Sequence, residues 1–528
     1  MSVIMENKIT ISEVIARKMQ EMGIDVELSL QVLQNYNAGR YDHFKPVKAA
    51  DIPEIDGKQI IDVTGGMHFA FDKAAAQRRI TDLGIELDLT ATGKVQGESL
   101  VFDRTALKTL GTRLYPLLAY GVLNGGSASS YVDQKKNRGF NQELFTICES
   151  GFHSLAEVSK GRAKGLTPAF INEDGTHGPS FLELKMRAVL ISALQYQELT
   201  GSKAPVLYPM FQMTSVYNNE DVLEAYRKYE DSPLLKDLIF ATGLDITQFS
   251  TGIQPMLAAL SHSKAGRPKT FFLNANGKTD QPLAMPGGHG QNFIILKNIY
   301  RNLYKEGKRF VYLGNVDNLG FTIDPVCLAL LALKGSQAGF DFSFRTPVDV
   351  KGGVLIIDED GKFNCADIGV GISAEEVARF EKAGKKILFN CATGLFNLEY
   401  LVNHIDYIIE HLPMRISDQQ KDAGDYAQAE QVTWEIIGLL DDLLIFGVDK
   451  YSRFLAAKLL LEGLMTSGTN LRHPQYPVDE KPEKNLRLIA ENLHRGLTSQ
   501  LESSYGMRLE NSRWVPKSIE ELKTGFRH

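Results

Sequence analysis

An acidic residue in the middle of the chain stands where a cation site is expected. The sequence GNVDNLG at residues 314–320 directly follows the apolar stretch Phe310–Leu313. An Asp at the C-terminal end of a buried strand is typical of cation sites in α/β enzymes, and oxygen ligands suit Mg²⁺, which often keeps water and substrate phosphate in its remaining positions. Asp317 is therefore a candidate ligand for Mg²⁺. The alternative is a turn in which the Asp317 and Asn318 side chains only cap the backbone.

Two glycine-containing segments could let a ligand come close to the backbone. The first, VLNGGSASS at residues 122–130, ends a strand-like run in Asn124, Gly125 and Gly126, where backbone N–H groups could hold an anion. The second, MPGGHG at residues 285–290, places Gly288 and His289 at the entry of a helix-like run. Neither is a P-loop or a G-x-G-x-x-G motif. Each is also what an ordinary surface loop looks like, so neither identifies a function alone.

Short apolar runs that alternate with helix-like segments must position these residues. The strand-like runs are Ala119–Leu123, Ala204–Tyr208, Thr270–Leu273, Phe310–Leu313, Val354–Ile357 and Ile387–Phe389. The helix-like segments between them include Ser180–Leu199, Gln291–Glu306, Ala374–Ala383 and Leu398–His411. This alternation predicts an α/β fold with a mostly parallel sheet flanked by helices, in which ligands bind at the C-terminal strand ends.

The same patterns divide the chain into three parts. Residues 1–114 are expected to form a largely helical N-terminal extension, because the apolar spacing over 11–41 is helical apart from a break near Gly23. Residues 115–415 hold all the strand-like runs above and are the expected catalytic domain. Residues 416–528 are expected to be a smaller, mostly helical C-terminal region that begins with a helix around 427–446.

Composition restricts the class of protein and its compartment. The 528 residues are 43% hydrophobic and 23% charged, which indicates an ordinary globular protein rather than a disordered or collagen-like chain. The net charge of −6 argues against a nucleic-acid-binding protein. The four cysteines show no zinc spacing and are expected to be reduced thiols, and we find neither a signal peptide nor a membrane-spanning apolar run. A cytoplasmic enzyme without a membrane partner is the resulting expectation.

Taken together and in order, these motifs resemble those of the UDP-glucose pyrophosphorylase family of UTP-dependent sugar-1-phosphate uridylyltransferases. The resemblance rests on the following segments: VLNGG at 122–126, PGGHG at 286–290, NVDNLG at 315–320, DVKGGV at 349–354, ILFN at 387–390, and SRFL at 452–455 with Lys458. It covers residues 120–460, about two-thirds of the chain. The fold that it implies is a Rossmann-like, GT-A-like nucleotidyltransferase sheet.

The resemblance also implies roles for individual residues. Asn124, Gly125, Gly126, Gly288 and His289 would bind the nucleotide. Asp317 would hold Mg²⁺ and nucleotide phosphate as a catalytic residue, together with a lysine that stabilises the phosphates. We favour Lys164 for that lysine because AKGLTP at 163–168 precedes SFLEL at 180–184, with Lys135 and Lys136 as competitors. On the sugar-phosphate side the resemblance points to Gly353, Asn390 and, as a weak match, Lys421.

The expected reaction is attack of a sugar 1-phosphate on UTP, giving a UDP-sugar, most simply UDP-glucose, and pyrophosphate. Departures from the family pattern leave alternatives open. Ser127–Ser130 replaces a Gly-Thr-containing stretch, and Gln254 stands near the position of the uracil-reading Gln, which itself falls at Thr251. The alternatives are a homologue that binds nucleotide sugars without turnover, and a uridylyltransferase for N-acetylglucosamine 1-phosphate or galactose 1-phosphate. The sequence leaves the oligomeric state open.

Overall fold

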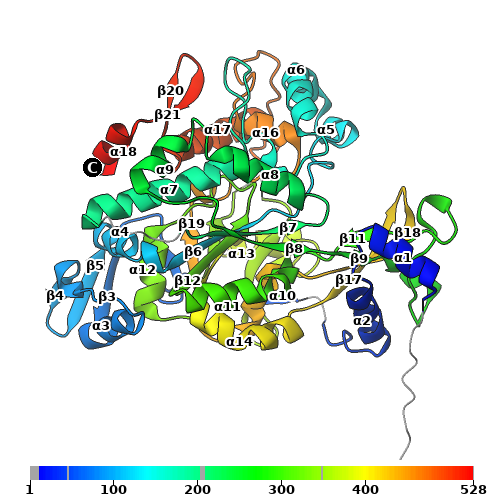
Figure 1. Cartoon of the computed structure of the whole chain (residues 1–528), viewed down its shortest axis with the longest axis horizontal. Helices are drawn as coiled ribbons and strands as arrows, with labels where there is room; N and C mark the ends of the chain where they lie inside the picture. The colour runs from blue at the N-terminus through cyan, green and yellow to red at the C-terminus, as the bar shows by residue number, and fades with distance from the viewer. Residues whose placement is uncertain (1–10, 45–46, 203–207, 347–348, 527–528) are drawn as a thin grey trace, which may run out of the picture.

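The computed structural model describes residues 11–44, 47–202, 208–346 and 349–526. Its central feature is a sheet in the middle of the molecule (Figure 1). The strand order of this sheet is β2-β19-β13-β16-β12-β6-β7-β8. These strands are Ile60–Asp62, Leu443–Val448, Ala338–Phe344, Leu388–Asn397, Phe310–Asn315, Leu118–Leu123, Met210–Ser215 and Ser250–Gln254. β16 runs antiparallel to both its neighbours, and the other pairs in this order are parallel. The predicted α/β fold with a mostly parallel sheet is therefore confirmed.

Helices cover both faces of the sheet because its central strands are apolar on both sides. Leu118, Tyr120 and Val122 of β6 face one core, which contains residues of α4 (Arg104–Arg113), α7 (Phe181–Thr200) and α12 (Pro325–Lys334). Ala119 and Leu123 face a second core with residues of α10 (Asn292–Ile295), α11 (Lys297–Lys305) and α14 (Leu398–His411). The alternation of side chains along a strand thus divides one strand between two cores.

The N-terminal segment divides between opposite ends of the molecule. The helices α1 (Glu13–Glu21) and α2 (Val26–Asn37) lie at one end. They confirm the helical structure that the apolar spacing over 11–41 predicted. At the other end lies the small sheet β3-β5-β4, made of His68–Asp72, Ser99–Asp103 and Lys94–Gln96, with α3 (Lys73–Asp82) beside it (Figure 1). Between them in sequence, β1 (Ala49–Asp51) and β2 join the central sheet.

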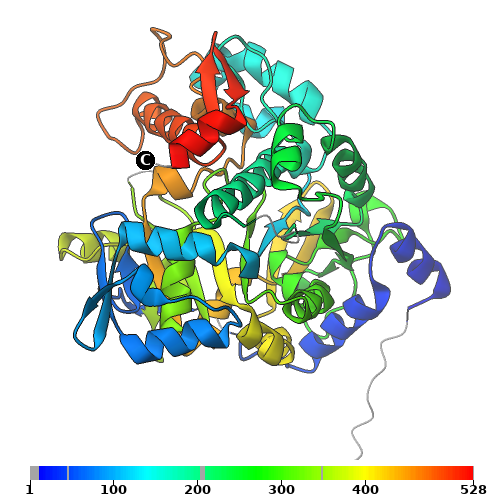
Figure 2. The same cartoon turned by 60° about the vertical axis from the view of Figure 1, so that its left-hand side comes forward.

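The C-terminal elements lie on the side of the sheet that α7 covers, next to α5 (Gln134–Phe140) and α6 (Gln142–Ser159), as both views show (Figures 1 and 2). In chain order they are α15 (Lys450–Arg453), α16 (Leu460–Thr466), α17 (Leu486–Ser503), β20 (Met507–Glu510), β21 (Arg513–Pro516) and α18 (Ile519–Phe526). α5 and α6 lie between the first glycine segment and Lys164 in the chain, and α6 packs against α16.

Three expectations about single elements need comment. The helix predicted around 427–446 is wrong: this stretch forms β18 (Gly424–Glu430), the 3₁₀ segment η7 (Thr433–Leu439) and the start of β19. A continuous apolar run does not distinguish a buried strand from a buried helix, and here the central sheet takes it as a strand. The strand expected at Thr270–Leu273 is also wrong, since only Phe271 forms an isolated bridge, to Leu260. Most of the run Ala204–Tyr208 lies outside the described residues.

The central sheet takes strands from all three predicted parts of the chain: β2 from residues 1–114, most strands from 115–415, and β19 from 416–528. The division into three domains stays a prediction. In the described part of the chain, no helix is both long and apolar enough to cross a membrane.

Candidate functional site

The register of two neighbouring strands brings the first glycine loop and Asp317 to one edge of the sheet. In the parallel pair β6–β12, Leu123 lies opposite Asn315, and the Val316 N–H donates to the Leu123 carbonyl at 3.3 Å. Asn124 and Asp317 therefore leave the sheet side by side at its C-terminal edge. Because β16 is antiparallel, its beginning, with Asn390, lies at the same edge. This is where ligands bind in open α/β sheets.

The loop Asn124–Gly126 is anchored on one side and open on the other. Asn124 is fully buried: its N–H donates to the Met213 carbonyl (2.8 Å), and its Oδ1 accepts the Gly165 N–H (3.1 Å). A Cβ built on Gly126 would meet nothing within 4 Å. In the described residues, the backbone N–H groups of Gly125 and Gly126 have no hydrogen-bond acceptor. Two adjacent free N–H groups beside open space can hold a phosphate oxygen.

Lys164 is hydrogen-bonded to this loop through its backbone. Its backbone N–H donates to the Gly126 carbonyl at 2.9 Å, and Ser127 bridges Ala163. The Lys164 side chain is buried, with Nζ 3.1 Å from the Ala457 carbonyl and 2.9 Å from the centroid of the Tyr131 ring. Burial lowers the pKa of Lys164 to about 8, while the carboxylates of Asp317 and Glu462 act in the opposite direction. Its ammonium therefore lies within electrostatic reach of Asp317.

The two competing lysines are placed differently. Lys135 and Lys136 are exposed on α5, and the Lys136 Nζ donates to the Ser130 hydroxyl at 2.9 Å. Lys164 is thus the candidate lysine that the fold joins to both the glycine loop and Asp317.

The Asp317 carboxylate is half-buried and available to a ligand. Among the residues that the structure describes, it has no hydrogen-bond or salt-bridge partner. The same residues contain no group of three or more His, Cys, Asp or Glu that could hold a metal ion. A cation at Asp317 would therefore take its other ligands from substrate phosphate and water. That ligand set fits Mg²⁺, which rarely has a cage made of protein atoms alone.

The second glycine segment packs against Gln431, the residue directly after β18. Gly288 has φ +80°, and a Cβ on it would lie 2.3 Å from the Gln431 carbonyl oxygen, so no side chain fits. The Gly290 N–H donates to that carbonyl (2.8 Å), and the Gln431 N–H donates to the Gly287 carbonyl (2.9 Å). The turn is fixed before any ligand arrives.

His289 is presented as a neutral hydrogen-bond donor. Its Nδ1 accepts the Thr433 N–H at 3.1 Å, which assigns the ring proton to Nε2. Burial lowers the pKa of His289 to about 4, so the ring is uncharged at pH 7. A neutral imidazole can donate from Nε2 to a phosphate or hydroxyl oxygen.

Gln254, at the end of β8, connects the two glycine segments. Its Nε2 donates to the Gly288 carbonyl and to Gln291 Oε1, both at 2.8 Å. Its Oε1 would lie 3.1 Å from a Cβ on Gly125. Thr251, by contrast, accepts a hydrogen bond from Gln212 within the sheet. Gln254 rather than Thr251 is therefore the residue between the two segments.

On the predicted sugar-phosphate side, Gly353 and Asn390 lie together. Gly353 begins β14 (Gly353–Asp358), which pairs with β15 (Phe363–Asp367). A Cβ on Gly353 would lie 2.4 Å from Cys365 Sγ and 3.6 Å from the Cβ of Asn390. The Asn390 Nδ2 contacts the same sulfur at 3.6 Å. These groups form a small floor next to the sheet edge that carries Asp317.

Three charged residues that the sequence did not single out lie beside this floor. Arg415 donates from Nη1 to Asp367 (3.3 Å) and from Nε to Glu435 Oε1 (2.7 Å). Burial raises the pKa of the Glu435 carboxyl, and Arg415 opposes that rise. Glu435 belongs to η7, the segment whose Thr433 holds His289, so the two sides of the site share one element. The only signal in the sequence was an acidic residue directly before a long apolar run.

Lys421 is not brought to the other predicted residues. It ends β17 (Arg415–Lys421), pairs with Gly424 at the tip of the β17–β18 hairpin, and has an exposed side chain. Arg415, at the other end of the same strand, is the residue that reaches the site.

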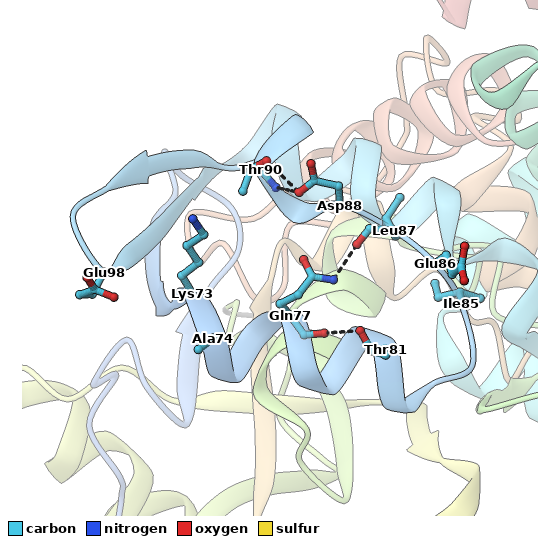
Figure 3. Close-up of a pocket in the computed structure, with 10 residues that line it drawn as sticks. All are labelled: Lys73, Ala74, Gln77, Thr81, Ile85, Glu86, Leu87, Asp88, Thr90 and Glu98. Carbon is cyan, nitrogen blue, oxygen red and sulfur yellow. Dashed lines mark hydrogen bonds between the residues drawn. The ribbon is translucent and has the colours of Figure 1, made fainter.

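A hollow of about 800 Å³ on the N-terminal part is separate from this site (Figure 3). Gln77 spans it, donating to the Leu87 carbonyl (2.8 Å) and accepting the Leu89 N–H (3.2 Å). The Asp88 carboxylate accepts hydrogen bonds from the N–H and the hydroxyl of Thr90. None of the predicted site residues lines this hollow.

Comparison with solved structures identifies the fold. The uridine diphosphate N-acetylglucosamine pyrophosphorylase from Trypanosoma brucei superposes with a TM-score of 0.56 at 14% identity, covering 93% of this chain and 92% of that one. The fold is that of the sugar-nucleotide pyrophosphorylases, a nucleotidyltransferase fold.

The chain belongs to the UTP–glucose-1-phosphate uridylyltransferase family, whose model matches residues 175–484. That range contains Gly288, His289, Asp317, Gly353, Asn390 and Lys421, whereas the first glycine loop and Lys164 precede it. The UTP–glucose-1-phosphate uridylyltransferase of Astragalus penduliflorus is 25% identical over 288 residues, 54% of this chain and 57% of that protein. A probable enzyme of the same name from Schizosaccharomyces pombe is 27% identical over 249 residues, 46% of this chain and 44% of that one. The chain thus matches about half the length of these curated relatives.

Proposed function

We propose that this protein transfers the uridylyl group of UTP to a sugar 1-phosphate, giving a UDP-sugar and pyrophosphate. The observation that carries the proposal is the β6–β12 register, which sets the N–H groups of Gly125 and Gly126 beside the Asp317 carboxylate. None of these groups has a hydrogen-bond partner among the residues that the structure describes. Binding of a nucleoside triphosphate needs both features: hydrogen-bond donors for the phosphate oxygens, and a carboxylate for the cation bound to the phosphates.

In the proposed mechanism a phosphate oxygen of the sugar 1-phosphate attacks the α-phosphorus of UTP, and pyrophosphate leaves. The nucleophile is already ionised, so no protein base is required, and catalysis consists of positioning and charge stabilisation. Mg²⁺ held by Asp317 would neutralise part of the developing charge on the α-phosphoryl oxygens. The Lys164 ammonium would add positive charge from the loop side, and His289 Nε2 would donate a hydrogen bond to the bound nucleotide or sugar phosphate.

Glucose 1-phosphate is the proposed co-substrate, supported by the names of the curated relatives. The hexose would lie over Gly353 and Asn390, where the missing side chain of Gly353 leaves the Cys365 sulfur as the floor. Asp367 and Arg415 at the border offer an acceptor and a donor for hydroxyl groups. N-acetylglucosamine 1-phosphate and galactose 1-phosphate are the alternatives that a substrate panel must include.

A second candidate function, binding of a nucleotide sugar without turnover, is favoured by the state of Lys164. Its Nζ already bonds to the Ala457 carbonyl and is covered by the Tyr131 ring. If this arrangement persists with UTP bound, the ammonium cannot reach the phosphates, and the site binds without catalysing.

One experiment separates the two functions. Pyrophosphate release from UTP and Mg²⁺ is measured with glucose 1-phosphate, N-acetylglucosamine 1-phosphate and galactose 1-phosphate, and binding of UTP and UDP-glucose is measured by calorimetry. We expect release with glucose 1-phosphate at the highest kcat/KM. Tight binding without product would favour the second function, and neither binding nor product would refute both.

A further inference from the structure

A lysine that the proposed mechanism does not use contacts the turn that carries Asp317. Lys185 of α7 is 0% exposed and has no carboxylate partner in the described part of the chain. Its Nζ donates to the backbone carbonyls of Asn318 and Phe321 (2.7 Å to the latter) and to the Tyr505 hydroxyl oxygen (3.1 Å). The Tyr505 hydroxyl itself donates to the Leu319 carbonyl at 2.8 Å. The three acceptors match the three protons of an ammonium group.

These contacts hold one turn from its buried side. The carbonyls of Asn318, Leu319 and Phe321 all accept from Lys185 or Tyr505, so their oxygens point away from the edge where the phosphates of a nucleotide would lie. The Asn318 side chain completes the turn by accepting the N–H groups of Gly320 (3.0 Å) and Leu455 (2.9 Å). Three carbonyl dipoles directed inward leave the Asp317 carboxylate as the negative group of the turn that faces a cation.

Such an arrangement is costly, which is why a role is expected for it. A lysine buried without a carboxylate loses its hydration, and an apolar side chain of similar size in its place is often neutral or stabilising. Burial lowers the pKa of Lys185, while the Asp317 carboxylate acts in the opposite direction, so the ammonium lies within electrostatic reach of Asp317. The three hydrogen bonds of Lys185 all act on this turn or on Tyr505, which itself contacts the turn, so we infer that the role of Lys185 is to fix the turn.

The turn is also connected to the C-terminal region through α7. Arg187, two residues along the helix, donates to the carbonyls of Tyr505 (2.6 Å) and Gly506 (2.9 Å) and to that of Leu234. Tyr505 is thereby held by its backbone on Arg187 while its hydroxyl reaches Leu319. The segment between α17 and β20 is thus part of the support of the Asp317 turn.

We propose that Lys185 and Tyr505 are positioning residues that fix the Asp317 turn for binding of a divalent cation with a nucleotide phosphate. The proposal rests on the proposed function for the identity of the ligand, but the fixing of the turn does not depend on turnover. Residues that orient a metal ligand typically change metal affinity by about 10- to 100-fold when they are replaced.

The test uses the full-length protein and three variants: Lys185→Met, Tyr505→Phe and the control Lys308→Met. Lys308 is the matched control because it is also buried, also donates to a backbone carbonyl (Pro116, 2.9 Å), and lies at the opposite end of β12 from Asp317. Hydrogen exchange of the amides of 318–321, the Mg²⁺ concentration for half-maximal pyrophosphate release, and the melting temperature are measured for each.

We expect Lys185→Met to speed exchange of these amides and to raise the half-maximal Mg²⁺ concentration about tenfold or more. Tyr505→Phe, which removes a single oxygen, should change both in the same direction by less, and Lys308→Met should change neither. If Lys185→Met does not fold, Tyr505→Phe decides the question. Exchange and Mg²⁺ dependence that match the Lys308→Met control overturn the proposal, as does faster exchange with unchanged Mg²⁺ dependence.

Absence of turnover in the unaltered protein would refute the proposed function. Hydrogen exchange of the amides of 318–321 would then be compared with and without Mg²⁺–UTP in the unaltered protein and in Lys185→Met. If Mg²⁺–UTP protects these amides in the unaltered protein but not in Lys185→Met, the proposal is supported; equal protection in both overturns it.

Discussion

The backbone N–H of Lys164 donates to the carbonyl of Gly126 at 2.9 Å. This bond joins two residues that are 38 positions apart in the chain, with α5 and α6 between them. Because of this bond, the backbone positions of Lys164 and the glycine loop depend on each other, and a change in one should displace the other. The Lys164 ammonium is then within electrostatic reach of Asp317, which comes from a different strand.

Asp317→Asn should abolish most activity at a small cost in stability. The carboxylate has no hydrogen-bond partner in the described part of the protein, but its charge stabilises the buried ammonium groups of Lys164 and Lys185, so the free energy of unfolding should fall by about 1 kcal/mol. Loss of the charge that holds the cation should slow pyrophosphate release about 100-fold or more. Asp324→Asn is the control, because Asp324 caps α12 and Asn caps equally well. A rate within a few-fold of that of the unaltered protein would show that Asp317 does not hold the metal.

The activity should fall as pH rises through about 8. The pKa of Lys164 is lowered to about 8, so its ammonium is the main form below that pH and the neutral amine above it. kcat/KM should show this alkaline limb, because it reports the free protein. Lys164→Met should be slow and lack the limb, and Lys136→Met should retain it.

Unfolding should not explain that alkaline loss. An unfolded lysine keeps its proton to about pH 10.4, so between about pH 8 and 10.4 the unfolded state binds more protons at this position. The contribution of Lys164 to stability therefore rises with pH over this window. A melting temperature that falls in parallel with kcat/KM would contradict the assignment of the limb to Lys164.

Gly126→Ala should separate folding from ligand binding. The added methyl group meets nothing within 4 Å, so the melting temperature should stay the same. If a phosphate lies against this backbone, the methyl group occupies its approach, and the dissociation constant for UTP should rise about tenfold or more. Gly139→Ala on α5, whose methyl group also meets nothing, is the control. Unchanged UTP affinity of Gly126→Ala in calorimetry would place the nucleotide elsewhere.

The two ends of β17 should differ in their effect on the sugar substrate. Arg415→Met removes the partner of both Asp367 and Glu435, so we expect KM for the sugar 1-phosphate to rise about tenfold and stability to fall by about 1–3 kcal/mol. Lys421→Met, at the exposed hairpin tip, should leave KM within about twofold. Steady-state kinetics of both variants decide which end of the strand serves the sugar phosphate.

The sequence by itself predicted the parts of the fold that depend on local pattern. The runs at Ala119–Leu123, Phe310–Leu313 and Val354–Ile357 are strands, and Ser180–Leu199 and Leu398–His411 are helices within a residue or so. Their alternation was enough for the α/β class, and the order of the motifs was enough for the family. Local pattern failed at 427–446, because hydrophobicity alone does not decide whether a buried run joins a sheet.

Only the tertiary structure decided which side chains meet. It joined Lys164 rather than Lys135 or Lys136 to Gly126, and it placed Gln254 rather than Thr251 between the glycine segments. It also placed Arg415 rather than Lys421 near Gly353 and Asn390. It also brought Lys185 and Tyr505, 320 positions apart, under one turn. Such contacts depend on strand register and helix packing between distant segments, and a spacing along the chain carries no information about them.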